Sequence, residues 1–225
     1  MPSLTTENYV KAIYQICVRD AQEAASTGKI AELLGVAPGT VTSMLKTLEG
    51  ANLAQYTPYE GVSLTASGQA LAMCVLRRHR LMELFLVKTL DLSWDEVHEE
   101  AENLEHAVSE TLINKIDDYL GNPTHDPHGD PIPQADGNMA QAESTPLLSF
   151  PENSPFRLVR VLDQSGDFLR FLSEVGLSIG AIGQIVKRSE TAEMVTLLLE
   201  GNETPLSYSV CKKLLVAKNE ENHPL

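Results

Sequence analysis

The chain has 225 residues, of which 43% are hydrophobic and 21% are charged. These values are typical of globular proteins, so they exclude a globally disordered chain and a fibrous repeat. The length allows one large domain or two to three small ones. The formal net charge of -14, if evenly spread, would argue against a nucleic acid or an anionic membrane as a partner.

The charge is concentrated in one part of the chain. Residues 1–90 carry a net charge of +1, residues 91–140 carry -12, and residues 141–225 carry -3. The acidic block therefore predicts a place that receives cations, while the near-neutral N-terminal part is free to meet an anion.

The cysteines and the first residues predict a cytoplasmic protein. Cys17, Cys74 and Cys211 are odd in number and far apart, without a CxxC pair, so we expect neither a disulfide framework nor a zinc ribbon. The opening residues MPSLTTENY lack the basic and apolar regions of a signal peptide, and no run of 18 apolar residues occurs. We expect no membrane partner.

The first 72 residues predict a winged helix-turn-helix domain. Apolar residues at helical spacing from Tyr9 to Cys17 indicate a first helix, capped by Thr5 or Thr6. A second short helix ends at Gly35 and a third begins at Pro38, which is the order of a helix-turn-helix. The segment LAQYTPYEGVSLT then predicts a two-stranded hairpin, the wing.

The remaining chain predicts a helical domain and a small β domain. Two long helical patterns cover residues 65–90 and 93–120, and we assign residues 73–133 to the helical domain. Seven prolines lie between residues 121 and 155, which indicates a linker, placed at 134–154. Short apolar runs with glycine turns in residues 155–225 predict a barrel of strands with one short helix.

The outward face of the third predicted helix is suited to DNA. It carries short hydrogen-bonding side chains and one lysine, which allow a helix to enter a major groove about 12 Å wide. A solvated helix face is the alternative, but the preceding helix and the wing favour DNA binding. The predicted contacts are Pro38, Gly39, Thr40, Thr42, Ser43 and Lys46 on this helix, with Ser26, Lys29 and Tyr59 as contacts to phosphate.

Histidines and glutamates at one-turn spacing predict metal binding. Glu102, Glu105 and His106 lie at i, i+3 and i+4, with His98 one turn earlier. The preceding helix carries His79 and Glu83 at i and i+4, and the six donors predict a pair of metal sites. Like charges on such a face repel unless a cation lies among them. The alternative is a solvated acidic helix with incidental histidines.

The donor types narrow the choice of metal. Oxygen and imidazole donors without a thiolate favour Mn²⁺ or Fe²⁺, although Zn²⁺, Co²⁺ or Ni²⁺ would also bind in vitro. The spacing is not HExxH, and no nucleophile stands beside an obvious base, so we expect no enzyme. A metal-independent winged-helix regulator and a metal-dependent hydrolase stay open as alternatives, the hydrolase being the weaker.

Six segments resemble one known family. They are TTENYVKAIY, IAELLGVAPGTVTSMLKTLE, LTASGQALA, RRHRLMELFL, EVHEEAENLEH and LGNPTHDPHGDPIP. Over residues 3–133 the chain resembles the diphtheria-toxin-repressor family of iron- and manganese-dependent transcriptional repressors, and residues 155–219 loosely resemble its SH3-like domain. The resemblance implies a mainly α fold with a small β domain: a winged helix-turn-helix, a helical dimerisation and metal-binding domain, and an SH3-like barrel.

The resemblance also implies partners and ligands. It implies a homodimer that binds palindromic double-stranded operator DNA when loaded with a divalent metal. The first metal site would take Glu102, Glu105 and His106, with Asn8 from the first helix. The ancillary site would take His79, Glu83 and His98, with additions near Asp163, Gln164 and Asp167.

Three positions depart from the family's patterns. In the family that this chain resembles, iron-responsive members typically have Cys at the position of Glu102 and Met at that of Asn8. Manganese-responsive members have Glu and Asp at these two positions. Glu102 therefore favours manganese, and Asn8 agrees with neither type. Lys11 replaces an acid of manganese-type two-domain members, which argues against a closely spaced pair of ions. The segment HDPHGDPIP resembles the family's linker, with His125 and His128 solvent-facing or structural.

Overall fold

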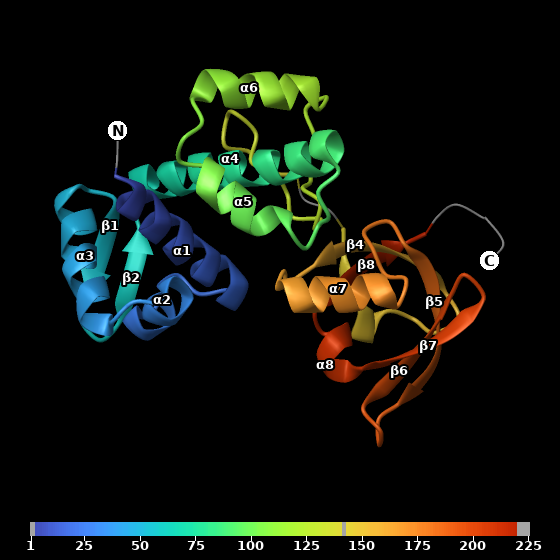
Figure 1. Cartoon of the computed structure of the whole chain (residues 1–225). Helices are drawn as coiled ribbons and strands as arrows, with labels where there is room; N and C mark the ends of the chain where they lie inside the picture. Colours follow the sequence, from blue (N-terminus) through green and yellow to red (C-terminus); the bar gives the residue numbers. More distant parts are fainter. Residues whose placement is uncertain (1–2, 141–142, 220–225) are drawn as a thin grey trace. The chain divides into compact units, whose positions relative to one another are not determined.

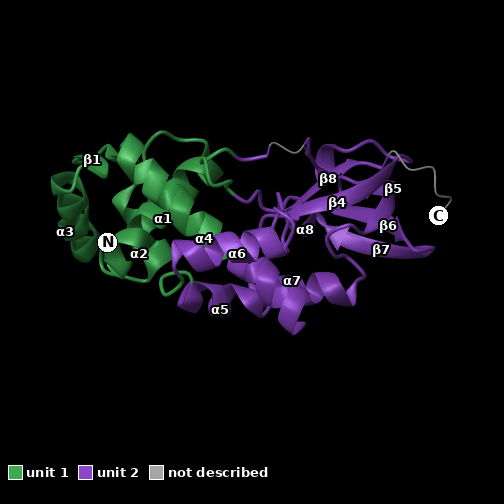
Figure 2. Ribbon diagram, turned by 90° about the horizontal axis from the view of Figure 1, so that it is seen from above, with its two compact units in different colours: residues 1–79, 105–108, 133–138 green, residues 80–104, 109–132, 139–225 purple. Residues whose placement is uncertain are grey.

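The structure is a computed structural model that describes residues 3–140 and 143–219. It consists of two compact units (Figure 2). Unit 1 comprises residues 1–79, 105–108 and 133–138, and unit 2 comprises residues 80–104, 109–132 and 139–225. No helix within the described ranges has both the length and the apolar character that crossing a membrane requires. Residues 220–225 of the predicted C-terminal domain lie outside the described residues.

Unit 1 contains the predicted winged helix-turn-helix (Figure 1). Its elements are α1 (Leu4–Asp20), α2 (Thr27–Leu34), α3 (Pro38–Gly50), β1 (Ala54–Thr57), β2 (Gly61–Leu64) and the first part of α4 (Ala66–Leu90). The strands β1 and β2 pair antiparallel, with Tyr56 opposite Val62, and form the wing.

Local chemistry sets the ends of these helices. Ser3 caps α1, because its side chain accepts a hydrogen bond from the Thr6 backbone, so the expected cap at Thr5 or Thr6 is wrong. Ser26 caps α2 in the same way. Gly35 ends α2 with a φ of 64°, a left-handed conformation that glycine adopts at little cost.

The core of unit 1 joins α1 to α3. Val10 and Ile13 of α1 are fully buried in one hydrophobic cluster with Leu45 and Leu48 of α3. Burial of such side chains stabilises the unit by about 1.5–3 kcal/mol each. The two helices are therefore connected through the close-packed core that they share.

The predicted helix over residues 93–120 is wrong, because the chain forms two helices, α5 (Val97–Leu104) and α6 (Glu110–Tyr119). The side chain of Ser109 accepts a hydrogen bond from the Leu112 backbone and so starts a new helix. Glu105 and His106 consequently lie in the turn after α5, not on its face. Leu112, which a continuous helix would bury, is 49% exposed.

Unit 2 contains an antiparallel sheet with the strand order β3-β8-β4-β5-β6-β7. The strands are β3 (Thr145–Pro146), β4 (Pro155–Val161), β5 (Ile182–Ser189), β6 (Met194–Leu199), β7 (Asn202–Ser207) and β8 (Leu214–Lys218), accompanied by η1 (Leu147–Ser149), α7 (Gly166–Glu174) and α8 (Tyr208–Cys211). This is the small β domain that the sequence predicts, although the polar strand β7 has no apolar run to reveal it.

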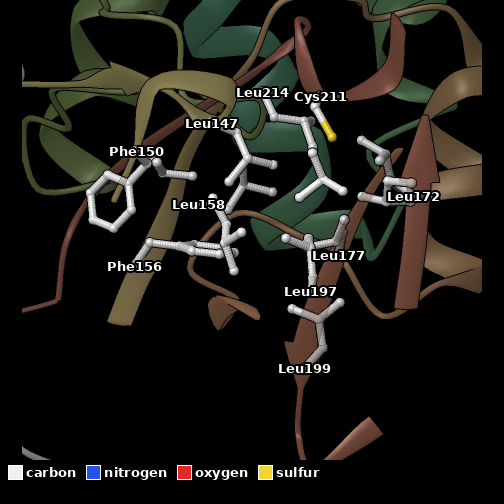
Figure 3. Packing of buried hydrophobic residues seen from close by; sticks show 14 of the residues in the cluster. Leu147, Phe150, Phe156, Leu158, Leu172, Leu177, Leu197, Leu199, Cys211 and Leu214 are labelled. Carbon is white, nitrogen blue, oxygen red and sulfur yellow. The ribbon is translucent and has the colours of Figure 1, made fainter. Parts of the chain in front are cut away.

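The barrel has its own hydrophobic core. Leucines from its strands and from α7 point toward one another (Figure 3), among them Leu158, Leu197 and Leu172. Leu147 and Phe150 are buried in the same core, and β3 pairs with β8. Residues 145–150, which fall in the range predicted as a linker, are thus part of the sheet and its core.

Candidate metal centres and nucleic-acid interface

Glu105 is the centre of a charged cluster in unit 1. Its side chain is completely buried. Lys11 Nζ donates hydrogen bonds to both of its oxygens, at 2.7 Å to Oε1 and 2.9 Å to Oε2. Oε2 also accepts a hydrogen bond from His79 Nδ1, at 2.7 Å. Burial raises the pKa of Glu105, but the His79 hydrogen bond and the charges on Lys11 and His79 outweigh it and hold the pKa below its ordinary value.

His106 is held by a residue of α1 that the sequence analysis missed. His106 Nδ1 lies 2.6 Å from Glu7 Oε2, which accepts its hydrogen bond. Glu7 is itself buried and lies 3.4 Å from the Arg78 guanidinium, which also donates to the Glu105 backbone carbonyl, at 3.2 Å. Glu7 and Lys11 are one turn apart on α1, so one face of this helix holds both Glu105 and His106.

Asn8 Oδ1 on α1 and His106 Nε2 are among the buried polar atoms of unit 1 that make no hydrogen bond in the described part of the chain. His106 Nε2 lies 3.1 Å from Glu105 Oε1, in a geometry that forms no hydrogen bond. Buried polar atoms without a partner are rare. A carboxylate, an imidazole and an amide oxygen fit a borderline-hard divalent ion, so these residues fit the metal that the sequence predicts.

In unit 2, the structure brings Glu83 and His98 together as the sequence predicts. His98 Nδ1 lies 3.2 Å from Glu83 Oε1, and Glu83 is almost fully buried. His98 Nε2 lies 3.9 Å from Glu102 Oε1, and both of these side chains are partly exposed.

His128 is fully buried beside Glu83, so of the two expected alternatives, solvent-facing or structural, the structural one holds. Its Nδ1 lies 3.6 Å from Glu83 Oε2, and its Nε2 donates to the Trp94 backbone carbonyl, at 2.7 Å. Glu83, Asp126 and His128 each offer a ligand atom, and these atoms lie within 4.8 Å of one another. The segment HDPHGDPIP thus supplies two candidate metal ligands, while its first residue, His125, is half-buried.

Burial and neighbouring charges shift the proton affinities in this second cluster. Burial lowers the pKa of His128, but the carboxylates of Glu83 and Asp126 outweigh it and raise the pKa to about 8. Burial and the charges on Glu83 and Asp130 raise the pKa of Asp126 to about 7. The acids of this cluster already pair with the Arg80 guanidinium, which lies 3.7 Å from Asp126 and 3.1 Å from Asp130, and with His128.

The loop that carries Asp126 and His128 is fastened to the barrel within unit 2. The Val161 backbone donates to the His128 carbonyl, at 2.9 Å. Asp130 accepts hydrogen bonds from Arg80, Arg160 and Gln164. These bonds fix the loop from both the helical part and the barrel of unit 2.

The further ligands that the resemblance implies are engaged elsewhere. Asp163 accepts a hydrogen bond from Lys213, at 2.6 Å. Gln164 donates to Asp130, at 3.3 Å, and the exposed Asp167 pairs with Arg170, at 2.5 Å.

Most of the predicted DNA contacts lie on the surface of unit 1. Pro38, Gly39, Thr40, Ser43 and Lys46 of α3 are exposed and Thr42 is half-buried, with its hydroxyl donating to the Pro38 carbonyl. Tyr59 is exposed at the tip of the wing, with a φ of 70°. Ser26 is used as the cap of α2, and Lys29 Nζ lies 2.7 Å from Asp20 Oδ2, so Lys29 already has an anionic partner.

A DNA-binding fold whose first helix holds a buried carboxylate and imidazole cluster defines a class, the regulators that couple a bound cation to DNA binding. Family models agree. Residues 1–62 match the N-terminal DNA-binding domain of the iron-dependent repressors, and residues 65–134 match their metal-binding and dimerisation domain. Residues 145–218 match the FeoA domain.

Individual relatives cover nearly the whole chain. The iron-dependent repressor IdeR of Mycobacterium leprae is 31% identical over 88% of this chain and 90% of its own length. The diphtheria toxin repressor of Corynebacterium efficiens is 29% identical over 81% and 83%. A manganese-dependent transcriptional repressor in complex with manganese has a TM-score of 0.85 at 34% identity, covering 95% of this chain and all of that one. ScaR with bound Zn²⁺ has a TM-score of 0.79 at 30% identity, covering 97% and 100%.

This chain belongs to the iron-dependent repressor family that includes the diphtheria toxin repressor. It is a metal-dependent transcriptional repressor by this membership. The family binds DNA and metal ions, dimerises through its middle domain, and consists of repressors, not enzymes.

Sequence reasoning missed Glu7, Asp126 and His128 as site residues for different reasons. Glu7 lies one turn before Lys11, but nothing in the sequence places this helix face against the turn at residues 105–106. Asp126 and His128 belong to the segment HDPHGDPIP, whose resemblance to the family's linker spoke against a metal site there. Their signal was the repeated Asp and His spacing inside a segment that also holds the buried Ile132.

Proposed function

We propose that this chain binds palindromic operator DNA as a homodimer and that Mn²⁺ or Fe²⁺ controls this binding. The main support for this proposal is that α1 contacts the candidate metal ligands on one side and contributes to the core of the DNA-binding domain on the other. Through Glu7 and Lys11 it holds His106 and Glu105. Through its apolar face it shares one hydrophobic core with α3, the helix with the predicted base contacts.

This arrangement supports a physical route from the metal ligands to DNA. Val10 and Ile13 are buried in the same hydrophobic core as Leu45 and Leu48 of α3, so a change in how α1 is held can reach α3 through that core. Two α3 helices of a dimer must match two half-sites in spacing. Metal and DNA affinities are then linked reciprocally, and operator DNA tightens metal binding by the factor by which metal tightens DNA binding.

The first metal ion would be held by Asn8, Glu102, Glu105 and His106, and the ancillary ion by His79, Glu83 and His98. The orphaned oxygen of Asn8 and the orphaned Nε2 of His106 support the first set. Asp126 and His128 are added here as candidate ligands beside Glu83. When bound, the ion supplies positive charge that offsets the repulsion among these carboxylates. The chain's own residues fix the donors in place before it arrives.

The donors and the relatives of this chain support Mn²⁺ or Fe²⁺ as its metal. The candidate ligands offer only oxygen and nitrogen, which suits Mn²⁺ and Fe²⁺. Similarity to a manganese-dependent repressor at 34% identity supports Mn²⁺, and similarity to a Zn²⁺-bound repressor supports binding of Zn²⁺ in vitro. The three cysteines are free thiols, which suits a cytoplasmic protein.

A DNA-binding titration tests the proposal. A duplex selected from a random pool by the Mn²⁺-loaded protein is titrated by fluorescence anisotropy with chelator, Mn²⁺, Fe²⁺ or Zn²⁺. We expect tight binding only with metal. Equal affinity in all four conditions would instead support a metal-independent winged-helix regulator.

A variant of Glu105 tests whether the metal dependence of DNA binding comes from the cluster around Glu105. Glu105→Gln keeps an acceptor for Lys11 and His79, whereas alanine would leave the Lys11 ammonium buried without its carboxylate. We expect Glu105→Gln to lose the metal response and to keep the fold by circular dichroism. Glu100→Gln, at an exposed position of α5, is the matched control. An unchanged metal response in Glu105→Gln would remove Glu105 from the site.

A further inference from the structure

We infer that Glu7 is a positioning residue that makes His106 a metal ligand by fixing which ring nitrogen carries the proton. This inference rests on the proposed function, because it concerns the same site. It adds a residue that lies beside the ligands without being one of them.

The proton can be placed from the hydrogen bond. The carboxylate oxygen Oε2 of Glu7 is the acceptor of this hydrogen bond, and an imidazole nitrogen can donate only when it carries the hydrogen. The distance of 2.6 Å between His106 Nδ1 and Glu7 Oε2 therefore requires the hydrogen on Nδ1. In the neutral ring this leaves the lone pair on Nε2.

His106 Nε2 has the surroundings of a ligand atom. It is buried, it makes no hydrogen bond in the described residues, and it lies 3.1 Å from Glu105 Oε1. Histidines that bind metal commonly donate their second N–H to a carboxylate, which orients the ring and raises its basicity. Glu7 occupies that outer position for His106.

Glu7 is itself held in place. Its side chain is only 9% exposed, and the Arg78 guanidinium lies 3.4 to 3.5 Å from its oxygens. A carboxylate fixed by both a cation and an imidazole cannot rotate away without losing two charged contacts. The ring of His106 is thus oriented before any ion binds.

Lys11 does the same for Glu105 from the next turn of α1. Oε2 of Glu105 accepts from Lys11 and His79, whereas Oε1 accepts from Lys11 and keeps a second lone pair. The outer shell of this centre is therefore built largely on α1. This helix also shares the hydrophobic core of unit 1 with α3.

The test is a site-specific titration by NMR. The full-length protein is labelled with ¹⁵N-histidine, and the ring signals of His106, assigned with a His106→Gln variant, are followed while Zn²⁺ alone is added. Glu7→Gln keeps an acceptor without the charge, and Glu7→Met removes both. Glu32→Met, at an exposed position of α2, is the control for the lost charge.

We expect the metal-free wild type to show the Nδ1–H tautomer and Glu7→Met to lose this preference. The affinity of His106 for Zn²⁺ should fall about 10- to 100-fold in Glu7→Met, less in Glu7→Gln, and stay unchanged in Glu32→Met.

Two results would overturn the inference: an Nε2–H tautomer in the wild type, or a Zn²⁺ affinity of Glu7→Met within about twofold of the wild type. Should Glu7→Met fail to fold, Glu7→Gln decides by the same criteria. If the His106 signals of the wild type do not change when Zn²⁺ is added, the proposed function itself is contradicted. This outcome distinguishes a failure of the proposed function from a failure of the inference about Glu7.

Discussion

Lys11 and Glu105 form a buried ion pair in which one ammonium group spans both carboxylate oxygens, at 2.7 and 2.9 Å. The pair connects α1 to the turn that follows α5, 94 residues later in the chain. A buried charge without its partner is costly, so this pair commits the two segments to each other in the metal-free state.

Replacing Lys11 should therefore destabilise the metal-free protein. We expect Lys11→Met to lower the free energy of unfolding by about 3–5 kcal/mol in the presence of chelator, because Glu105 keeps its burial and loses its cation. Added Mn²⁺ should restore part of this loss by returning positive charge. Chemical unfolding with and without Mn²⁺ measures both effects. The control is Lys88→Met at an exposed position of α4, and a loss in Lys11→Met no larger than in the control would contradict the prediction.

Raised pKa values in the second cluster predict a pH-dependent stability. The pKa of Asp126 is raised to about 7 and that of His128 to about 8, so the folded state binds these protons more tightly than the unfolded state. Their contribution is fully present below the ordinary values of 3.8 and 6.5. It is lost as the pH rises through about 7 for Asp126 and about 8 for His128.

Thermal unfolding at about pH 6 and about pH 8, in chelator, checks this linkage. Asp126→Asn keeps an acceptor for the backbone N–H groups of His128 and Asp130 but cannot ionise. The wild type should lose more stability over this range than Asp126→Asn. Burial lowers the pKa of His125, so this residue adds stability as the pH rises. Its effect is the same in both proteins and does not change the comparison. Equal pH dependence in the two proteins would refute the assignment. Stabilisation by Mn²⁺ should grow with pH, because its ligands must be deprotonated.

Gly129 should be essential to the second centre. Its φ is 84°, and a Cβ there would lie 1.9 Å from the Val159 carbonyl oxygen. Gly137 has nearly the same φ, 83°, with nothing within 4 Å, so Gly137→Ala isolates the backbone strain. We expect Gly129→Ala to destabilise the protein by about 1–3 kcal/mol more than Gly137→Ala. Gly129→Ala should also weaken metal binding at Asp126 and His128, which the NMR signals of the His128 ring measure. Equal stability of Gly129→Ala and Gly137→Ala would contradict the close contact.

Lys46 should contribute more to DNA affinity than Lys29. Lys46 is exposed on α3, whereas Lys29 already pairs with Asp20 at 2.7 Å. Lys46→Ala should reduce the salt dependence of DNA binding by about one unit of slope, and Lys29→Ala by less. Anisotropy titrations at several salt concentrations measure this. The Mn²⁺ affinity of both variants should match that of the wild type. A larger loss of DNA affinity in Lys29→Ala than in Lys46→Ala would contradict the prediction.

Cys211 should be unreactive in the folded protein. Burial raises its pKa to about 11, because the thiolate would lie in an apolar core. Ellman's reagent at about pH 8 should leave this thiol unmodified until denaturant is added. The variant Cys211→Ser should show the same number of reactive thiols as the wild type when folded and one fewer when unfolded. Rapid labelling of Cys211 in the native protein would contradict its burial.

The sequence by itself determined the elements whose signals are local. The periodicity of Val10, Ile13 and Ile16, the glycine at residue 35 and the proline at residue 38 define the helix-turn-helix, because helix packing and helix ends depend on residues a few positions apart. The same holds for the wing and for most strands of the barrel. The residue types at positions 79, 83, 98, 102, 105 and 106 likewise indicated a divalent ion, because ligand chemistry is a property of the side chain.

Only the tertiary structure decided how these donors are held. The break before Ser109 moves Glu105 and His106 off the helix face, and contacts across more than 90 residues join them to Lys11 and Glu7. The burial of His128 against Glu83 depends on the fold of a proline-rich segment that reads locally as a linker. Such contacts depend on which surfaces pack together, and no periodicity along the chain records that.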